Sequence, residues 1–187
     1  MLLKVAEFNN DQMTLMAGDL TVPIGLGSTL EAYWNFNEGE GDATADLGGD
    51  HPGTLTGADG PAAWTDDAPT LQGENPFAIS FDGVDDYVFT EYAGVGGSNP
   101  RTVSFWVKTT ATTTHGLVAW GDSSRNATKY HIRVNPGTGT IRTEVQGGNN
   151  WGTTSIVDDQ WQPVVSLVPD IPKVNQPDVL PAVDGAL

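Results

Sequence analysis

The sequence predicts an all-β protein folded as a two-sheet antiparallel sandwich. Two observations favour this fold class. Apolar and polar residues alternate with a period of two in most segments between residues 31 and 168, and the 187 residues include 23 Gly and 12 Pro. Strands that alternate in this way belong to antiparallel sheets with one solvated face, and abundant Gly and Pro suit tight turns. No segment of about ten residues has the apolar stripe of a helix, so no helix is expected.

The longest alternating segments predict the main strands, two of which form a hairpin. These strands are expected at Ala32–Phe36, Thr102–Lys108, Tyr130–Asn135 and Ile141–Gln146, and Pro136–Gly139 forms the turn between the last two. Shorter strands are expected at Ala78–Phe81, Tyr87–Thr90, Leu117–Trp120 and Val164–Val168.

One face of each predicted strand is expected to supply the core. Ser104 and Trp106 fall on the opposite, solvated face of their strand. Arg133 and Arg142 lie opposite each other on the polar face of the hairpin, which indicates a solvated surface more than an anion site. The predicted core consists of Trp34, Phe36, Phe81, Phe105, Val107, Ile132 and Val134.

The two ends of the chain differ from its middle. Residues 1–29 are expected to be a leader, a linker or a donor strand, with candidate strands at Leu2–Phe8 and Met13–Val22. The tail after Trp161 is rich in proline, which cannot donate to a sheet ladder. No segment approaches the roughly 20 apolar residues of a membrane helix, so membrane insertion is not expected. The first residues also lack the pattern of a signal peptide.

The charge balance excludes nucleic acid as an expected partner. There are 24 acidic residues against 8 basic ones, whereas phosphate binding needs a basic surface. Most of the 17 Asp lie in Gly-rich loops, where a short carboxylate forms turns, binds Ca²⁺ or adds to an acidic surface. Cysteine is absent, so the sequence has neither a disulfide framework nor a thiol site.

A family resemblance rests on four segments that follow one another in order. They are Ala32–Gly41, Ile79–Val88, Arg101–Lys108 and Asp158–Trp161, and the last is followed by Val183-Asp184-Gly185. In this order the segments resemble the laminin G-like jelly-roll domains of the concanavalin A-like lectin superfamily. The resemblance covers residues 30–187 as one domain and implies an antiparallel two-sheet jelly roll at the cell surface or outside the cell.

The resemblance is incomplete at the C-terminal end. Gln162-Pro163 stands where the family usually has a pair of histidines, and Ala182 stands where it has an aromatic residue. The family continues for further strands beyond the point that Leu187 reaches here. We therefore expect a jelly roll that lacks some C-terminal strands.

Catalysis is not expected. No Glu-x-Asp-x-x-Glu pattern places carboxylates on one strand, as the laminarinase-type hydrolases of the superfamily do. The nearest acidic pair, Glu38 and Glu40, lies in a Gly-flanked turn, and the histidines at positions 51, 115 and 131 are far apart in sequence. No Gly-x-Ser-x-Gly turn or phosphate-binding loop occurs.

A structural calcium site is the most specific positive prediction. Asp82, Asp85 and Asp86 surround Gly83, which lets carboxylates and carbonyls converge, and Glu38 and Asp46 are expected to supply further ligands. The family resemblance also implies calcium. An Asp-Gly turn capped by its own side chains explains the same residues without metal.

A carbohydrate site is the second candidate, built on aromatic side chains outside the predicted core. Trp151 follows the polar segment Gly147–Asn150, which is interpreted as a loop that presents the ring, with Asn150 beside it. Trp120 is a further candidate platform, although a tryptophan serves more often in packing. Asn126-Ala127-Thr128 matches a glycosylation acceptor, a weak pattern by itself.

Together these features predict a non-catalytic extracellular or cell-surface module that binds carbohydrate or protein, or has a structural role. The alternative is a structural subunit of an extracellular filament or lattice. In that alternative an N-terminal segment supplies the missing strand in its own chain or to a neighbouring copy, because an unpaired sheet edge accepts a strand from another chain. A stretch of a longer chain, with its remaining strands beyond Leu187, explains the same features equally well.

Overall fold

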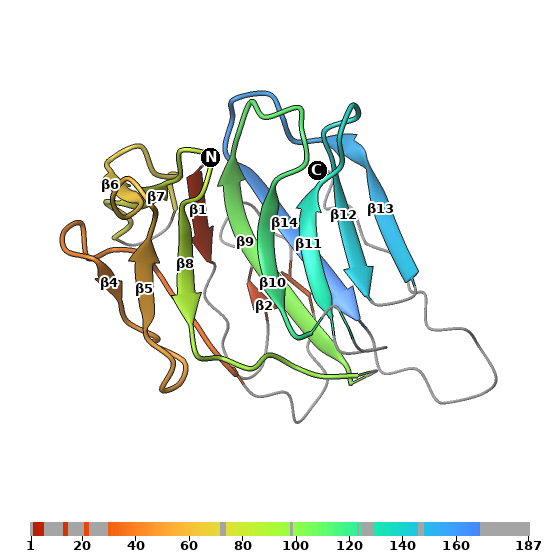
Figure 1. Cartoon of the computed structure of the whole chain (residues 1–187), viewed down its shortest axis with the longest axis horizontal. Helices are drawn as coiled ribbons and strands as arrows, with labels where there is room; N and C mark the ends of the chain where they lie inside the picture. The colour runs from red at the N-terminus through yellow and green to blue at the C-terminus, as the bar shows by residue number, and fades with distance from the viewer. Residues whose placement is uncertain are drawn as a thin grey trace. The chain divides into compact units, whose positions relative to one another are not determined.

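The computed structural model describes residues 30–71, 74–97, 99–122, 124, 129–145 and 148–168, and the backbone of residues 2–5, 13–14 and 21–22. Within these ranges all regular structure is β and no residue is helical, which confirms the predicted all-β class (Figure 1). No helix in this part of the chain is long and apolar enough to cross a membrane.

The chain forms two compact units. One comprises Met1–Tyr92 with Phe105–Val107, and the other comprises Ala93–Ser104 with Lys108–Leu187. Strand β9 (Arg101–Lys108) contributes residues to both units.

The first unit contains short antiparallel strands in three groups. Strands β1, β7 and β6 are neighbours in that order, β5 lies between β4 and β8, and β2 pairs with β3. Phe36, Leu55, Ile79 and Phe81 are buried in this unit. The strands are β1 (Leu2–Val5), β2 (Met13–Thr14), β3 (Thr21–Val22), β4 (Ala43–Thr44), β5 (Gly53–Thr56), β6 (Ala63–Thr65), β7 (Ala78–Ser80) and β8 (Tyr87–Thr90).

The second unit contains the four-stranded antiparallel sheet β10-β11-β12-β13, whose strands lie side by side in Figure 1. The predicted hairpin is confirmed: β11 pairs with β12 so that Val134 faces Ile141, and Gly137 and Gly139 in the turn have positive φ. The strands are β10 (Gly116–Trp120), β11 (Tyr130–Val134), β12 (Thr140–Val145), β13 (Gly148–Ser155) and β14 (Gln162–Val168).

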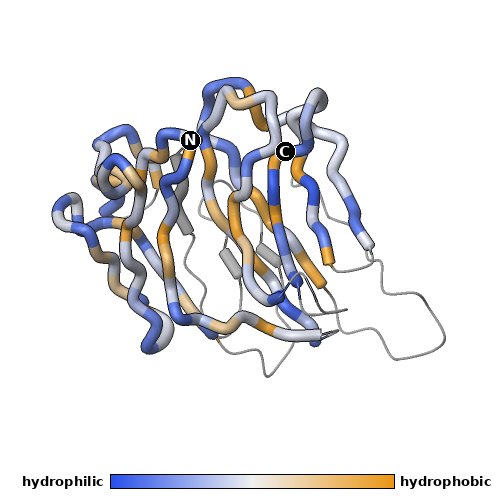
Figure 2. Tube along the Cα trace, in the orientation of Figure 1, coloured by the Kyte–Doolittle hydropathy of each residue, from blue (hydrophilic) through white to orange (hydrophobic). Residues whose placement is uncertain are grey.

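Strand β14 contacts the buried face of this sheet. The hydroxyl of Tyr130 on β11 and the Oγ of Ser166 on β14 form a hydrogen bond of 2.7 Å, and Ser166 also lies 3.2 Å from the Oγ1 of Thr143 on β12. Ile132 and Val134 are fully buried on the same face. Hydrophobic segments accordingly lie along β10, β11 and β14, whereas β13 is not hydrophobic (Figure 2).

Six of the seven predicted core residues are buried, and Trp34 is the exception. The predicted strand Ala32–Phe36 does not form: this segment has no regular structure, and Phe36 has a φ of 51°, which lies outside the range of strands. Phe36 is still buried, whereas Trp34 is only partly buried and its indole N–H donates to the carbonyl of His51 at 2.8 Å.

The prediction that β9 has one solvated face is also wrong. Ser104, Phe105, Trp106 and Val107 are all buried, so both faces of this part of the strand are covered. A serine is small enough to be buried between larger neighbours, and tryptophan gains more than most residues from burial of its ring. Alternation in the sequence therefore marks the two faces of β9 without telling whether either of them is solvated.

Several strands were not predicted from the sequence, and the most important is β13. Residues Gly148–Asn150, interpreted above as a loop, form the start of this strand. Strand β13 lies at the edge of its sheet and most of its residues are polar, so it lacks the apolar alternation that identifies strands. The unpredicted strands of the first unit, β4, β5 and β6, have two to four residues each.

Several predicted features lie wholly or partly outside the described residues. These include the segment Asn126-Ala127-Thr128, the segment Val183-Asp184-Gly185 and most of residues 1–29. Within the last range, the described backbone of β1 pairs antiparallel with β7, so that Leu2 faces Ser80 and Leu3 faces Ile79.

Candidate functional site

The register of the four-stranded sheet gathers polar residues on one of its faces. On β11, Tyr130, Ile132 and Val134 are buried, so His131 and Arg133 point to the other face. Both of these residues are only partly covered. We call this second side of the sheet the polar face.

Neighbouring strands add their own residues to the polar face. In the paired register Arg133 faces Arg142, and His131 faces Glu144. On the next strand Asn149 faces Glu144, and Trp151 faces Arg142. Because residues opposite each other in a sheet lie on the same side of it, the polar face consists of His131, Arg133, Arg142, Glu144, Asn149 and Trp151.

Three cations surround the carboxylate of Glu144. The Lys129 Nζ lies 2.9 Å from its Oε2, and the Arg142 Nη2 lies 2.7 Å from its Oε1. The Nη2 of Arg133 donates to the same Oε1. Lys129, Arg133, Arg142 and Glu144 are called the basic cluster below.

The surroundings shift the protonation of two groups in this region. Burial of Glu144 raises its pKa, but Lys129 and the two arginines together outweigh burial and lower the pKa below its ordinary value. Burial and the charge of Lys129 lower the pKa of His131. Glu144 is therefore ionised and His131 neutral at neutral pH.

Trp151 is the exposed aromatic ring of the polar face, with 55 % of its surface accessible. The guanidinium of Arg142 lies over the ring, 5.7 Å from its centroid, which is cation–π geometry. The backbone N–H of Trp151 donates to the side-chain oxygen of Asn150 at 3.0 Å. Asn150 faces Thr143, so it belongs to the opposite side of the sheet and supports the strand that holds Trp151.

Trp120 is not brought together with Trp151, because β10 and β13 are opposite edges of the sheet. Its ring stacks on Tyr130 at 4.3 Å and 22°, and its indole N–H donates to the carbonyl of Val95 at 3.1 Å. A Cβ at Gly94 would lie 2.2 Å from this ring, so Gly94 allows the close approach of the backbone. These contacts indicate a packing role for Trp120.

A shallow open depression of about 280 Å³ borders Trp120 and continues toward the basic cluster. Lys129 and His131 line it together with Trp120 and Tyr130. Trp120 pairs with Tyr130, whose side chain lies on the buried side of the sheet, so the depression lies at the β10–β11 edge.

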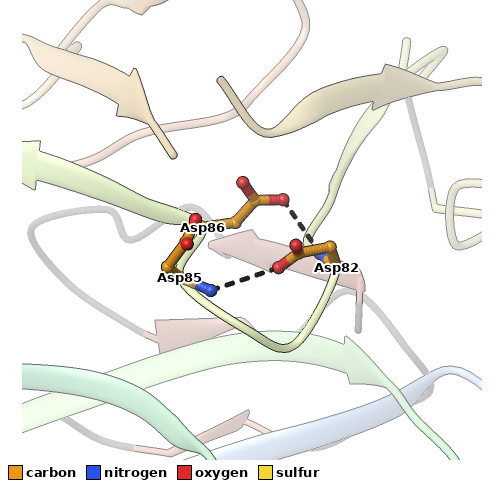
Figure 3. Close-up of side chains that lie close together, drawn as sticks. All are labelled: Asp82, Asp85 and Asp86. Atoms are coloured by element: carbon orange, nitrogen blue, oxygen red, sulfur yellow. Dashed lines mark hydrogen bonds between the residues drawn. The ribbon is translucent and has the colours of Figure 1, made fainter. Parts of the chain in front are cut away.

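The predicted calcium residues Asp82, Asp85 and Asp86 converge in the turn between β7 and β8 (Figure 3). The Oδ1 of Asp82 accepts the backbone N–H of Val84 at 2.7 Å and that of Asp85 at 3.3 Å. The Oδ2 of Asp86 accepts the N–H of Asp82 at 2.9 Å, and the Oδ1 of Asp85 accepts the N–H of Ala58 at 2.8 Å. We call these three residues the acidic turn.

The acidic turn fits a calcium ion, and it also closes without one. One oxygen from each carboxylate lies within 4.8 Å of the others. Oxygens that share a calcium ion at about 2.3–2.6 Å are at most about 5 Å apart, so the spacing is suitable. The N–H of Val84 lowers the pKa of Asp82 and holds its carboxylate ionised, as a metal ligand or a turn cap requires.

Glu38 and Asp46, predicted as further calcium ligands, do not belong to the acidic turn among the described residues. Glu38 accepts hydrogen bonds from the Thr44 hydroxyl at 3.2 Å and from the N–H of Ala45 at 2.9 Å. The Asp46 carboxylate holds the loop around it by accepting several backbone N–H groups. These are the N–H groups of Tyr33 at 2.7 Å, Gly48 at 2.9 Å, Gly49 at 3.1 Å and His51 at 3.2 Å.

Sequence reasoning missed the basic cluster, although one signal was available. Alternate positions on a confirmed hairpin share a face. The register of the hairpin therefore places Arg133, Arg142 and Glu144 side by side. The sequence pattern indicates a solvated surface for Arg133 and Arg142 alone, because it does not tell that they and Lys129 share the carboxylate of Glu144.

Comparison of the chain with family models, with curated proteins and with solved structures gives no match.

Proposed function

We propose that this protein is a non-catalytic carbohydrate-binding module of the cell surface or extracellular space, and that its binding site is the polar face. The observation that supports the proposal is the exposed ring of Trp151 beside Arg142 on an open sheet. Sugar rings stack on exposed aromatic faces, and neighbouring polar side chains bind their hydroxyl groups.

The polar groups needed beside such a platform are present in the register. Asn149 and Glu144 face each other next to the pair formed by Arg142 and Trp151. The amide of Asn149 provides donors and an acceptor, and the guanidinium of Arg142 provides further donors, as a hydroxyl-rich ligand requires. Because the strands hold these side chains, little ordering is needed when the ligand binds.

The proposal is tested by comparing Trp151→Ala with Phe89→Ala. Phe89 is a matched control, since 56 % of it is exposed on β8 in the first unit. A glycan array identifies ligands, and isothermal titration calorimetry measures their affinity. Trp151→Ala should weaken binding by about 10-fold or more, as loss of one stacking platform costs on the order of 1–3 kcal/mol, while Phe89→Ala binds as wild type does. Equal binding by wild type and Trp151→Ala would place the site elsewhere.

The finer fold that goes with this proposal is a jelly-roll sandwich. The hydrogen bonds of Ser166 on β14 to Tyr130 and Thr143 support it, since they join a separate strand to the buried face of the β10–β13 sheet. An experimental structure would test this arrangement. Strands that are not arranged as the two packed sheets of a jelly roll would contradict it.

A structural calcium ion in the acidic turn is part of the proposal. The spacing of Asp82, Asp85 and Asp86 supports it, and carbonyls and water would complete the six to eight oxygens that calcium takes. Such an ion would fix the loop between β7 and β8 and would take no part in a reaction.

The second candidate function is a structural subunit that assembles by strand exchange. Pairing of β1 with β7 supports this candidate, because it shows an N-terminal strand used as a sheet neighbour within its own chain. Donation of the same strand to another copy would be a domain swap, and head-to-tail swaps that do not close form filaments.

A further inference from the structure

We propose that the polar face selects anionic glycans, whose carboxylate or sulfate groups bind the basic cluster. This inference rests on the proposed function, since it names the ligand class of the same site. It follows from the charge, the hydrogen-bonding capacity and the register of the cluster.

The first argument is an excess of positive charge in the basic cluster. Lys129, Arg133 and Arg142 contribute three positive charges around the single carboxylate of Glu144. The whole chain has only 8 basic residues against 24 acidic ones, so this concentration contrasts with the rest of its composition. One further anionic group on the cluster would bring its charge closer to balance.

The second argument is unused hydrogen-bonding capacity. Two guanidinium groups and an ammonium carry far more N–H donors than the two oxygens of Glu144 accept. The Nε atoms of Arg133 and Arg142 are buried without an acceptor among the described residues, so the donors that a ligand can reach are the outer guanidinium nitrogens. Carboxylate and sulfate groups match the planar guanidinium fork, and bidentate pairs of this kind are among the strongest hydrogen bonds in proteins.

The third argument is the register of the two arginines. Arg133 and Arg142 face each other directly across β11 and β12. Repulsion between their like charges disfavours this arrangement. Glu144 bridges both guanidinium groups through one oxygen and Lys129 through the other, so it relieves only part of the repulsion. An anion from a ligand relieves more of it, and this favours the bound state.

The geometry also couples the charge to the sugar platform. Arg142 contacts both Trp151 and Glu144, so the stacking surface and the basic cluster share one side chain. A sugar ring on Trp151 therefore holds its ring substituents next to the guanidinium of Arg142. The net negative charge of the rest of the protein is screened over about 8 Å at physiological salt, which leaves the adjacent cations dominant at the ligand.

The experiment compares glycans that differ only in charge. Calorimetry at physiological salt uses a galacturonate tetrasaccharide beside its fully methyl-esterified form, and a sulfated galactan tetrasaccharide beside the unsulfated one. The carboxylate arm and the sulfate arm separate the two sources of negative charge. We expect at least one acidic member to bind about 10-fold or more tightly than its neutral counterpart.

Charge-removing variants localise the effect. Lys129→Gln should reduce the preference for the acidic glycan by about 10-fold, because it removes one charge-assisted hydrogen bond. Lys108→Gln, on β9, removes the same charge elsewhere and should preserve the preference. Thermal unfolding of each variant separates loss of affinity from loss of structure, and Arg142→Gln serves as a second variant if Lys129→Gln is unstable.

Each result has one meaning. Equal or tighter binding of the neutral glycans overturns the anionic preference and leaves the carbohydrate-binding function standing. An acidic preference that Lys108→Gln removes and Lys129→Gln preserves overturns the assignment to the basic cluster. Binding of neither acidic nor neutral glycans overturns both this inference and the proposed function.

Discussion

At the scale of single residues, Glu144 determines whether the polar face is stable. Its carboxylate is almost fully buried and is the acceptor that Lys129, Arg133 and Arg142 share. Without its negative charge, the three cations would repel one another across two adjacent strands. The residue is thus a positioning group for the basic cluster and not a candidate catalyst.

Replacement of this carboxylate should destabilise the protein. Glu144→Gln is expected to lower the free energy of unfolding by about 1–3 kcal/mol, between the effect of an exposed ion pair and that of a buried one. Glu91→Gln, an exposed control after β8, should change it by less than about 0.5 kcal/mol. Urea denaturation at pH 7 measures both, and equal stability of the two variants would show that the cations do not depend on Glu144.

Glu144 also makes the stability of the folded state depend on pH. The pKa of Glu144 is lowered on folding, so its ionised form stabilises the folded state above the unfolded pKa, and this stabilisation is lost as pH falls through the folded pKa. The stability difference between wild type and Glu144→Gln should therefore be full at pH 7 and shrink between about pH 5 and pH 3. A difference that grows toward acid pH would mean that the pKa is shifted in the other direction.

At the scale of elements, the hairpin shows what sequence alone predicts. Period-two alternation located β11 and β12, and Gly137 and Gly139 marked the turn, because only a left-handed backbone closes it. Strand β13 escaped prediction since an edge strand needs no apolar side chains. Trp151 was identified as exposed, but its partner Arg142 followed only from the pairing of β12 with β13.

The acidic turn shows how far the sequence alone predicts the residues of a site. The close spacing of Asp82, Asp85 and Asp86 in sequence was enough to predict their convergence, because a turn brings neighbours together. Glu38 and Asp46 are distant in sequence, and their placement depends on which backbone N–H groups their loops leave unpaired. The acidic character of Glu38 and Asp46 therefore did not predict where they lie relative to the acidic turn.

If calcium binds the acidic turn, it should stabilise the folded state by mass action. At about 10 to 100 times its dissociation constant, calcium should raise the melting temperature by about 3–10 °C relative to chelator. Asp85→Asn keeps a side-chain oxygen for the N–H of Ala58 but removes the charge, so it should weaken the shift. Asp122→Asn changes a different exposed turn and should leave the shift intact. Identical melting of wild type with calcium and with chelator would remove the metal site.

At the scale of the whole molecule, residues 1–29 decide between a binding module and an assembling subunit. Deletion of these residues removes β1, the neighbour of β7. Strand exchange predicts that the full chain forms concentration-dependent oligomers and that the deleted chain is a folded or partly folded monomer in light scattering. Leu3→Pro is a control that keeps the length of the chain and removes one N–H from the ladder of β1. Unchanged assembly after deletion, or a full chain that is always monomeric, would contradict strand exchange.

The strongly negative charge of the whole chain contrasts with the basic cluster. With 24 acidic and 8 basic residues, the surface repels most anions, and the polar face is a local exception on one sheet. This contrast makes the site of a bound acidic glycan predictable, because three of the described cations gather around Glu144.

The central claim is that a glycan binds the polar face, and NMR tests it most directly. In a spectrum of the ¹⁵N-labelled protein, each of the 6 tryptophans gives an indole N–H signal that titration with the bound glycan can shift. We predict that the largest changes are those of the Trp151 indole and of backbone N–H groups in β12 and β13. Changes confined to the strands β4, β5 and β8, with the Trp151 signal unmoved, would contradict the claim.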